Sequence, residues 1–245
     1  HIPSSHIRAV GTKTLRSTYN AEDFLSKASH ALGRQIQIIS GYEEARLVYL
    51  GVSHSINHDH RKRLVIDIGG ASTEFIIGHD FTPQRLESLS LGCVTSAARY
   101  FSNAITRDAF ENAYLAASYK VEYIQNSYRH AGWDIAFGTS GTIRSIANLL
   151  PQTENTGATI TLQLLEQLIE KTITSQGRNL LPVSKQRQDV LPAGMAILKA
   201  VLKQLDIRML HVADATLKEG LIYDTLGRQH PTDIRDSTVE QLVRR

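Results

Sequence analysis

The chain of 245 residues has a single cysteine, Cys93, and lacks any long apolar run. One cysteine excludes an internal disulfide and is typical of a reducing compartment, so we expect a cytoplasmic protein. No segment approaches the roughly 18 apolar residues of a membrane span and no signal peptide opens the sequence, so no membrane partner is expected. We interpret Cys93 as a small buried residue between a strand and a turn, because no histidine lies near it in the sequence.

The sequence also has little net charge, +3 with histidine neutral. This excess is compatible with a polyanionic ligand but is far below that of a nucleic-acid-binding tail, so no nucleic-acid partner is expected. With 42% hydrophobic residues, the chain is long enough for one large or two modest globular domains with real cores.

Segments with the periodicity of strands and of helices alternate along the chain, which predicts an α/β fold. We expect strands at 7–10, 36–39, 65–68, 73–78, 86–91, 133–137 and 209–212. We expect helices at 21–32, 43–50, 107–129, 143–150, 162–174, 192–205 and 216–226. Thr161 is expected to cap the helix at 162–174, the helix at 192–205 should be amphipathic, and residues 175–188 should be mostly loop.

The segment Val65 to Gly78, VIDIGGASTEFIIG, carries two carboxylates among apolar and small residues. Pairing its β-branched arms as a hairpin around Gly70 and Ala71 places Asp67 opposite Glu74. Like charges that face each other across a ladder are destabilising, so either one carboxyl is protonated or a cation lies between them. Mg²⁺ is the simplest such cation.

The turn of this hairpin, GGAST at 69–73, offers backbone N–H groups without bulky side chains, followed by two hydroxyls. This is the chemistry of a loop that approaches phosphate closely. The candidates for phosphate binding are Gly69, Gly70, Ser72 and Thr73. The alternative, which the segment leaves open, is a hairpin whose glycines serve the turn and whose acids face water.

A second loop of this kind, GTSGT at 138–142, lies between a predicted strand and a predicted helix. It presents N–H groups and hydroxyls at the positive end of a helix dipole. Its candidates for phosphate binding are Gly138, Ser140, Gly141 and Thr142. An ordinary N-cap formed by Ser140 or Thr142 explains the pattern as well. Before the last predicted helix, Lys218 is within reach of an anion, although a solvated lysine is the simpler interpretation.

The start of the helix at 43–50 provides a third acidic group. The sequence from Ser40 to Glu43 has the pattern of a capping box, in which the first and last residues satisfy each other's backbone N–H groups. With Glu43 assigned to the cap, the sequence gives no structural role for Glu44.

Six segments of the chain, taken together, resemble one known family in their order and spacing. They are ISGYEEARLVYLGV, LVIDIGGASTEFIIG, LGCVTSAARYF, GTSGTI, DVLPAGMAIL and ADATLKEGLIYD. From about Ile7 to Asp224 the chain is similar to the exopolyphosphatase and guanosine pentaphosphate phosphohydrolase family of the actin-like ATPase superfamily. The resemblance implies an α/β fold: a ribonuclease-H-like domain, with a mixed sheet flanked by helices, and an incomplete preceding domain of the same type.

The resemblance also implies roles for single residues. Glu44 corresponds to the catalytic glutamate, Asp67 and Glu74 to acidic groups that hold Mg²⁺ in a cleft, and the turn 69–73 to the second phosphate loop. Arg16, in GTKTLRSTYN, matches a family arginine of the first domain that faces the cleft. The alternative for Arg16 is a surface arginine beside a helix start.

Two departures from the family pattern matter. The first strand pair, with its Asp-x-Gly-Ser-x-Ser phosphate loop, should lie upstream of Ile7 and is not in this sequence. The usual Gly-Ala-Leu-Arg-Glu-Gly segment reads ATLKEG, so Lys218 puts a point charge where a bidentate arginine clamp is usual. We therefore expect the tail of domain I at 1–47, domain II at 48–228, and a linker or the start of a missing C-terminal region at 229–245.

The activity implied by the resemblance is hydrolysis of a terminal phosphoanhydride bond in polyphosphate or guanosine pentaphosphate, with Glu44 deprotonating the attacking water. The sequence does not separate these substrates. Two alternatives stay open: a non-catalytic fragment that binds a polyanion, and an actin-like ATPase or sugar kinase. Because an incomplete first domain leaves strand edges unpaired, a homodimer is expected.

Overall fold

The structure, a computed structural model, describes residues 7–56, 59–151, 158–180 and 183–227. Its main element is a six-stranded sheet in the order β5-β4-β3-β6-β8-β7. The strands are β3 (Lys62–Ile68), β4 (Thr73–His79), β5 (Thr82–Leu89), β6 (Ile135–Thr139), β7 (Thr159–Ile160) and β8 (Leu210–Val212). β3, β4 and β5 pair antiparallel, β3, β6 and β8 run parallel, and β7 is antiparallel to β8. This is the mixed sheet expected from the sequence.

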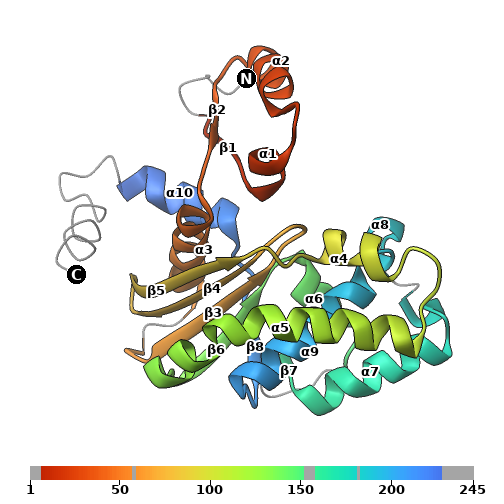
Figure 1. Cartoon of the computed structure of the whole chain (residues 1–245). Helices are drawn as coiled ribbons and strands as arrows, with labels where there is room; N and C mark the ends of the chain where they lie inside the picture. The colour runs from red at the N-terminus through yellow and green to blue at the C-terminus, as the bar shows by residue number, and fades with distance from the viewer. Residues whose placement is uncertain (1–6, 57–58, 152–157, 181–182, 228–245) are drawn as a thin grey trace.

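Helices cover both faces of this sheet (Figure 1). On one face lies α3 (Gly41–Ser55), with α10 (Leu217–Gly227) packed against it. The other face carries α5 (Arg107–Ala131) and α9 (Leu191–Leu205). The remaining helices of the main body are α4 (Cys93–Tyr100), α6 (Gly141–Asn148), α7 (Leu162–Thr174), the 3₁₀ turn η2 (Arg178–Leu180) and α8 (Lys185–Gln188).

The strands divide their side chains between two cores. Ile66 of β3 belongs to the larger core, which it shares with α5 and α9, whereas Val65 belongs to the smaller core beneath α3. Because successive side chains of a strand point to opposite faces, Asp67 lies on the same face as Val65. Ile76 of β4 also belongs to the smaller core, so Glu74 lies on the α3 face as well. The alternation therefore brings both carboxylates under α3.

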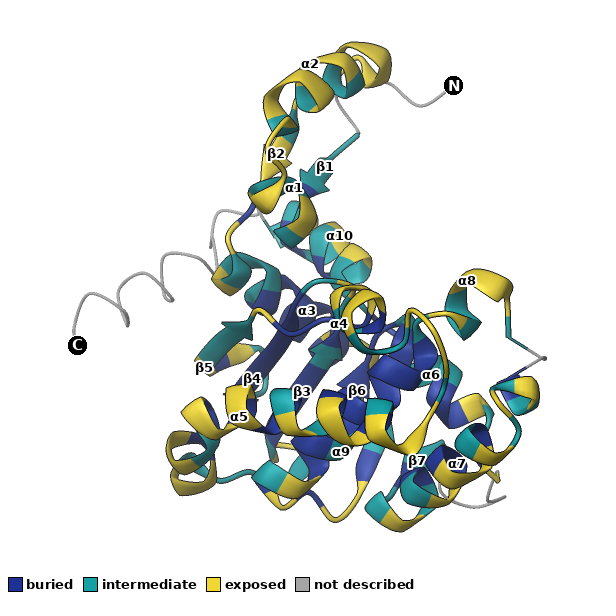
Figure 2. Cartoon of the chain, turned by 45° about the vertical axis from the view of Figure 1, so that its right-hand side comes forward, coloured by how far each residue is buried: buried dark blue, intermediate teal, exposed yellow. Residues whose placement is uncertain are grey.

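Helix α9 lies in the middle of the larger core (Figure 2). It is buried around most of its circumference because α4, α5, α6 and α7 all pack against it. Lys199 and Lys203 lie on its remaining stripe, with their Nζ atoms 3.4 and 3.8 Å from Glu166 Oε1 of α7. The helix is therefore amphipathic as expected, with a narrow polar side.

The N-terminal residues form a separate small unit that stands beside the main body (Figure 1). Its elements are β1 (Ala9–Gly11), α1 (Lys13–Ser17), α2 (Ala21–Leu32) and β2 (Ile36–Ile38), and the two strands make a parallel two-stranded sheet of their own. Arg8 Nη1 joins this unit to α10 through Asp224 Oδ2 at 2.5 Å. The boundary expected between residues 47 and 48 falls inside the continuous helix α3. The linker expected at 229–245 lies outside the described residues.

Most expected elements are present, and two helices have the predicted bounds. These are α2 and α7, and Thr161 caps α7 as expected, its Oγ1 accepting from Leu164 N at 3.3 Å. Cys93 is buried as expected, but the strand and turn assigned around it are wrong, because α4 begins at this residue. The loop expected at 175–188 is interrupted by η2 and α8.

Candidate phosphate and metal site

The two carboxylates of the hairpin face each other as predicted. Asp67 is the direct partner of Glu74 in the antiparallel register of β3 and β4. Glu74 is only 1% exposed, and its Oε1 accepts a hydrogen bond from Ser88 Oγ at 2.8 Å. The hairpin therefore holds one deeply buried and one partly buried acid on the same face of the sheet.

The first turn of α3 adds a third carboxylate to this face. Ser40 Oγ accepts from Glu43 N at 3.1 Å, which confirms the predicted cap. The Glu43 carboxylate, however, accepts two hydrogen bonds at 2.8 Å from Arg46, so its side chain pairs along the helix. Glu44 lies one helical turn before Val48, a residue of the smaller core, and it therefore sits on the stripe of α3 that faces the sheet.

Arg16 faces Glu44 from the N-terminal unit, as expected. Both of its terminal nitrogens lie 3.4 Å from Glu44 Oε2, and Nη1 also donates to the carbonyl of Ile39. Arg16 and Glu44 have side-chain exposures of 21% and 12%. The contact joins the small unit to the site, and the interpretation of Arg16 as a mere surface residue does not fit it.

The three carboxylates act on one another electrostatically. Burial, followed by the negative charge of Glu44, raises the pKa of Asp67 to about 7. Burial, followed by the charges of Glu44 and Asp67, raises the pKa of Glu74 to about 8. Burial also raises the pKa of Glu44, against the opposing effect of Arg16. Glu44, Asp67 and Glu74 therefore converge, with one guanidinium at the edge of the group.

The chemistry of this group fits a hard divalent cation. Two opposed carboxylates repel each other when both are ionised, and a cation between them removes this repulsion. Mg²⁺ is commonly held by one or two carboxylates together with water and phosphate oxygens. Within the described ranges, no group of three or more His, Cys, Asp or Glu side chains has the arrangement of a complete metal site. Asp67 and Glu74 could thus supply two ligands, and the remaining positions would fall to water or to a bound phosphate.

The turn after Asp67 is docked onto the start of α4. Gly69 O accepts from Cys93 N at 2.9 Å, and Gly70 O accepts from Val94 N at 2.9 Å and from Thr95 N at 3.2 Å. The carbonyls of the turn therefore satisfy the first amides of α4, while no hydrogen bond to the N–H of Gly70 is present among the described residues. Such a fixed turn with an available N–H suits an anion.

The two hydroxyl residues that follow the turn differ in their surroundings. Ser72 is 3% exposed, and its hydroxyl hydrogen bond to Glu74 opposes the rise in the pKa of that carboxyl. Thr73 is fully buried, and its Oγ1 donates to Leu91 O at 2.5 Å. The Thr73 hydroxyl thus holds the segment that follows β5 against the hairpin.

The loop at 138–142 lies next to the hairpin, because β6 pairs with β3 and Thr139 is the partner of Asp67. Gly138 lies inside β6, between Ile66 of β3 and Val212 of β8, where it is buried. Ser140 is the N-cap of α6: its Oγ accepts from the N–H groups of the second and third residues of the helix, at 3.1 Å each.

The other two candidates of this loop open α6. Thr142 is 2% exposed and its Oγ1 lies 3.4 Å from Cys93 Sγ, so this side chain points inward. Gly141, the first residue of α6, contacts the guanidinium of Arg187. Arg187 lies in α8, a four-residue helix within a segment expected to be loop. At the far end of the site, the side chain of Lys218 is 75% exposed and 3.5 Å from Glu219, as expected for a solvated lysine.

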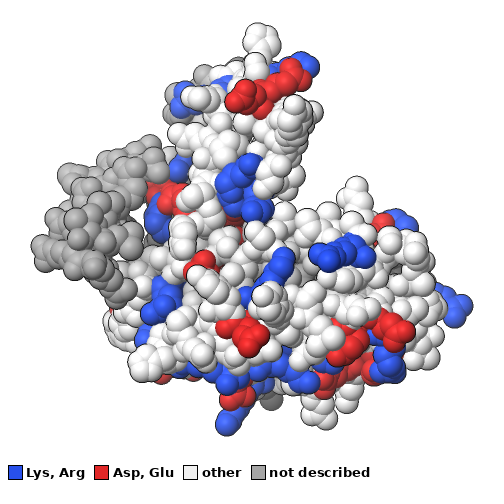
Figure 3. Space-filling model, viewed as in Figure 1, with Lys and Arg blue, Asp and Glu red and all other residues white. Residues whose placement is uncertain are grey.

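A hollow lies between the N-terminal unit and the main body, beside the Gly70 turn. Its volume is about 630 Å³, and its lining comes from α1, the turn, α4 and α5. Three of the lining side chains are cationic: Lys13, Arg99 and Lys120. Figure 3 shows Lys and Arg side chains on both sides of the junction between the small unit and the body. The hollow beside the turn is thus positively charged, while Glu44, Asp67 and Glu74 are not part of its lining.

Comparison with known proteins gives a consistent result. The model of the Ppx/GppA phosphatase family matches residues 1–229. The guanosine-5'-triphosphate,3'-diphosphate pyrophosphatase of Aeromonas hydrophila is 39% identical over 248 residues, 100% of this chain and 50% of that protein. A putative exopolyphosphatase of Haemophilus influenzae is 39% identical over 240 residues, 96% of this chain and 74% of that protein. The chain spans about half the length of the first of these relatives.

Solved structures agree in fold. A Ppx/GppA family member from Aquifex aeolicus matches with a TM-score of 0.76 at 23% identity, over 92% of this chain and 75% of that chain. An exopolyphosphatase from Cytophaga hutchinsonii matches with a TM-score of 0.77 at 23% identity, over 90% of this chain and 75% of that chain. The fold class expected from the sequence is confirmed. None of the helices in the described ranges combines the length and the apolar character needed to cross a bilayer.

Proposed function

The chain belongs to the Ppx/GppA phosphatase family, and we propose that it is the part of a phosphohydrolase that cleaves terminal phosphoanhydride bonds of inorganic polyphosphate or of guanosine pentaphosphate. The observation that carries the proposal is the convergence of Glu44, Asp67 and Glu74 beside a docked glycine turn. The names of the relatives in Aeromonas hydrophila and Haemophilus influenzae support both substrates.

Glu44 is the group that prepares the attacking water. It is largely buried, which raises its pKa and makes it a stronger base than a solvated glutamate. Arg16, at 3.4 Å from Glu44 Oε2, counteracts this rise in the pKa and fixes the direction of the carboxylate. A positioned carboxylate beside a phosphate loop suits in-line displacement by water.

Asp67 and Glu74 would hold Mg²⁺, which supplies charge neutralisation at the phosphoryl oxygens when bound. The protein's own contribution is to keep both carboxylates on one face, opposite each other, with Ser88 fixing one oxygen of Glu74. The N–H of Gly70 and the cationic hollow next to it would receive the phosphate groups. Because that hollow is lined from both units, substrate binding would also hold the units together.

Phosphate release measured with malachite green tests the proposal, with long-chain polyphosphate, guanosine pentaphosphate and ATP compared in the presence and absence of Mg²⁺. We expect polyphosphate or guanosine pentaphosphate to be preferred to ATP. Glu44→Gln should lower kcat roughly 10²–10⁴-fold, with the same Mg²⁺ dependence. The matched control is Glu43→Gln, on the same helical turn, which should keep the activity of the unaltered chain.

The alternatives give different results in the same assay. Full activity of Glu44→Gln would contradict the role assigned to this carboxylate. A chain that binds polyphosphate without releasing phosphate would be a polyanion-binding module, and a preference for ATP would indicate an actin-like ATPase or a sugar kinase.

Oligomeric state and location are part of the same proposal. The parallel sheet of β1 and β2 has only two strands in the described part of the chain, so its outer edges can pair with another strand. A homodimer in the cytoplasm is the expected form, and light scattering coupled to gel filtration measures it. A strictly monomeric chain over a range of concentrations would contradict dimerisation.

A further inference from the structure

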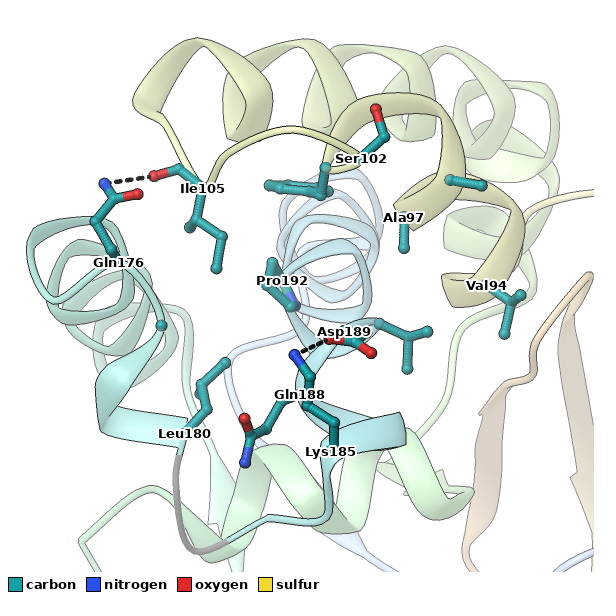
Figure 4. A pocket seen from close by; sticks show the side chains of 14 residues that line it. Val94, Ala97, Ser102, Ile105, Gln176, Leu180, Lys185, Gln188, Asp189 and Pro192 are labelled. Atoms are coloured by element: carbon teal, nitrogen blue, oxygen red, sulfur yellow. Dashed lines mark hydrogen bonds and ion pairs between the residues drawn. The ribbon is translucent and has the colours of Figure 1, made fainter.

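A second cavity lies on another face of α4 than the hollow beside the Gly70 turn. Its volume is about 430 Å³, and binding sites for small molecules have volumes of roughly 300–1,000 Å³. Its walls come from α4, the loop after α4, the residues that follow α7, and α8, together with the start of α9 (Figure 4). The apolar part of its lining includes Val94, Ala97, Phe101, Ile105, Leu180 and Pro192. The cavity therefore suits a ligand with apolar surface.

Small residues keep this space open. Protein interiors contain few voids larger than a water molecule, so a cavity of this size needs a cause. α4 faces it with Ala97 and Ala98, and the turn after α7 faces it with Gly177. Gly177 has a φ of +78°, and a Cβ there would lie 2.8 Å from Ile105 Cδ1, so glycine is required at this turn. Ala98 is exposed, so the cavity is open to solvent on the α4 side.

One side chain separates this cavity from the glycine turn of the hairpin. Val94 lines both the cavity and the hollow. Its backbone N–H donates to Gly70 O at 2.9 Å, and a Cβ at Gly70 would lie 3.2 Å from Val94 Cγ2. A ligand with a phosphate group at the Gly70 turn can therefore reach the cavity across Val94.

The two substrates that the proposed function leaves open differ in what they gain from such a cavity. Inorganic polyphosphate is charged along its whole length and gains nothing from apolar walls. Guanosine pentaphosphate carries a flat purine ring with apolar faces next to its phosphates. An apolar cavity beside the glycine turn therefore favours the nucleotide.

Several polar atoms in the lining of the cavity are hydrogen-bond acceptors. Gln176 Nε2 and Gln188 Nε2 donate to backbone carbonyls at 2.6–3.1 Å, and within the described residues the side-chain oxygen of neither glutamine accepts a hydrogen bond. Asp189 Oδ1 accepts from Lys185 Nζ at 2.8 Å, while Asp189 Oδ2 has no partner in the same part of the chain. Three oxygens are thus available to a ligand that donates hydrogen bonds, and Lys185 supplies a cationic donor beside them.

These donors and acceptors match the edge of guanine. Guanine donates from its ring N–H and its exocyclic amine and accepts at the neighbouring O6. A carboxylate accepts two such donors, and an ammonium group donates to O6. The side chains of Lys185 and Asp189 are 82% and 58% exposed, and an exposed ion pair contributes little stability, so the pair can open around a base. Adenine has an amine in place of O6, and this amine would face the Lys185 ammonium unfavourably.

We propose that this cavity binds the guanosine of guanosine pentaphosphate, with Asp189 and Lys185 recognising the edge of the base. The proposal rests on the proposed function for the phosphate part of the substrate, and it goes further by choosing between the two substrates. The base would lie between the apolar walls, while the phosphate arm would pass Val94 to reach the Gly70 turn. Polyphosphate would use only the turn and the cationic hollow.

Calorimetric titration of the 245-residue chain with GTP, ATP and inorganic tripolyphosphate, in buffer with Mg²⁺, tests the proposal. The three ligands carry three linked phosphates with guanosine, with adenosine or with no nucleoside, and we expect GTP to bind at least about tenfold more tightly than the other two. Ala98→Trp, which fills the cavity from its open side, should weaken GTP binding at least about tenfold and change tripolyphosphate binding less than about twofold. The matched control is Ala104→Trp, at an exposed alanine after α4 that does not line the cavity. Circular dichroism reports whether each variant is folded.

Asp189→Asn tests recognition of the base independently of the cavity volume. An amide keeps one acceptor and replaces the other by a donor, so it no longer matches the two donors of guanine. The ratio of GTP affinity to ATP affinity should therefore fall at least about tenfold. The matched control is Asp23→Asn, because Asp23 also pairs with a lysine four residues away, Lys27, at 2.8 Å on an exposed helix face. An unchanged ratio in Asp189→Asn would overturn the role assigned to this carboxylate.

The outcomes separate this inference from the proposed function. A preference for GTP that Ala98→Trp removes, together with no phosphate release from any substrate, would sustain the inference and defeat the hydrolase proposal. Phosphate release from polyphosphate, together with equal binding of GTP and tripolyphosphate, would sustain the hydrolase proposal and overturn the inference. A chain that binds none of the three ligands, with or without Mg²⁺, would overturn the inference as well.

Discussion

Replacing Asp67 by asparagine tests whether a cation holds the two opposed carboxylates of the hairpin together. Asp67 and Glu74 are direct partners across β3 and β4, and the Cβ atoms of such partners lie about 4.5–5.5 Å apart. Two unit charges about 5 Å apart repel by roughly 3 kcal/mol at an effective dielectric near 20. Burial is the main cause that raises the pKa of Asp67 to about 7 and that of Glu74 to about 8, so the full repulsion is felt only under alkaline conditions.

Above pH 8, Asp67→Asn should therefore stabilise the metal-free chain and remove most of its response to Mg²⁺. At about 2–4 °C per kcal/mol for a protein of this size, roughly 3 kcal/mol corresponds to a rise of about 6–12 °C in melting temperature. In the unaltered chain, Mg²⁺ at about 100 times its dissociation constant should contribute a similar amount, about 2.7 kcal/mol.

Differential scanning fluorimetry with a Mg²⁺ titration measures both effects, and Ca²⁺ in place of Mg²⁺ shows how selective the site is. The control is Asp23→Asn, whose carboxylate pairs with Lys27 on the exposed face of α2. A variant Asp67→Asn that gains as much from Mg²⁺ as the unaltered chain would show that this carboxylate is not a ligand. A lower melting temperature without metal would refute the repulsion itself.

Three further results follow from the same contacts. Without metal, the free energy of unfolding should fall as the pH rises from about 4 to about 8. The cause is the raised pKa values of Asp67 and Glu74, because the folded state keeps protons that the unfolded state has released. Urea titrations at several pH values measure this trend, and a free energy of unfolding that rises over this range would contradict it. Gly220→Ala should cost about 1–3 kcal/mol, since its Cβ would be 1.8 Å from Leu47 O, whereas Gly227→Ala meets nothing within 4 Å. Asp224→Ala should cost about 1–3 kcal/mol, because Arg46 loses a partner at 2.6 Å but keeps its pairing with Glu43; a loss below about 1 kcal/mol in chemical denaturation would contradict this.

The register of the hairpin could be predicted from the sequence because two local signals agree. The β-branched arms of VIDIGGASTEFIIG specify strands, and the glycine turn fixes which residues face each other. A slip of one residue would have moved Ile66 and Phe75, both fully buried, out of the larger core. Burial and turn geometry therefore demand the same pairing, and that pairing brings Asp67 to Glu74.

Elements whose formation depends on tertiary contacts were missed. α4 has only eight residues, and its first amides are satisfied by the carbonyls of the Gly69–Gly70 turn, which is distant in sequence. α8 has four residues without a buried member, so no hydrophobic period marks it. The position of Arg187 follows from this unmarked helix, and the contact with Gly141 spans two segments that no local pattern connects.

The sequence could single out Glu44, the third carboxylate, because the start of α3 determines which of its side chains face the sheet. The contact of Glu44 with Arg16 could not be predicted in the same way. Ser40 caps the helix through Glu43 N, which sets the start of the helix and hence the direction of every later side chain. With this start, Ala45, Val48 and the residues one turn further on lie on the sheet, and Glu44 lies beside them. The neighbouring Glu43 points along the helix to Arg46. The cap and the buried stripe of α3 therefore agree on one phase of the helix, and that phase places Glu44 on the side that carries Asp67.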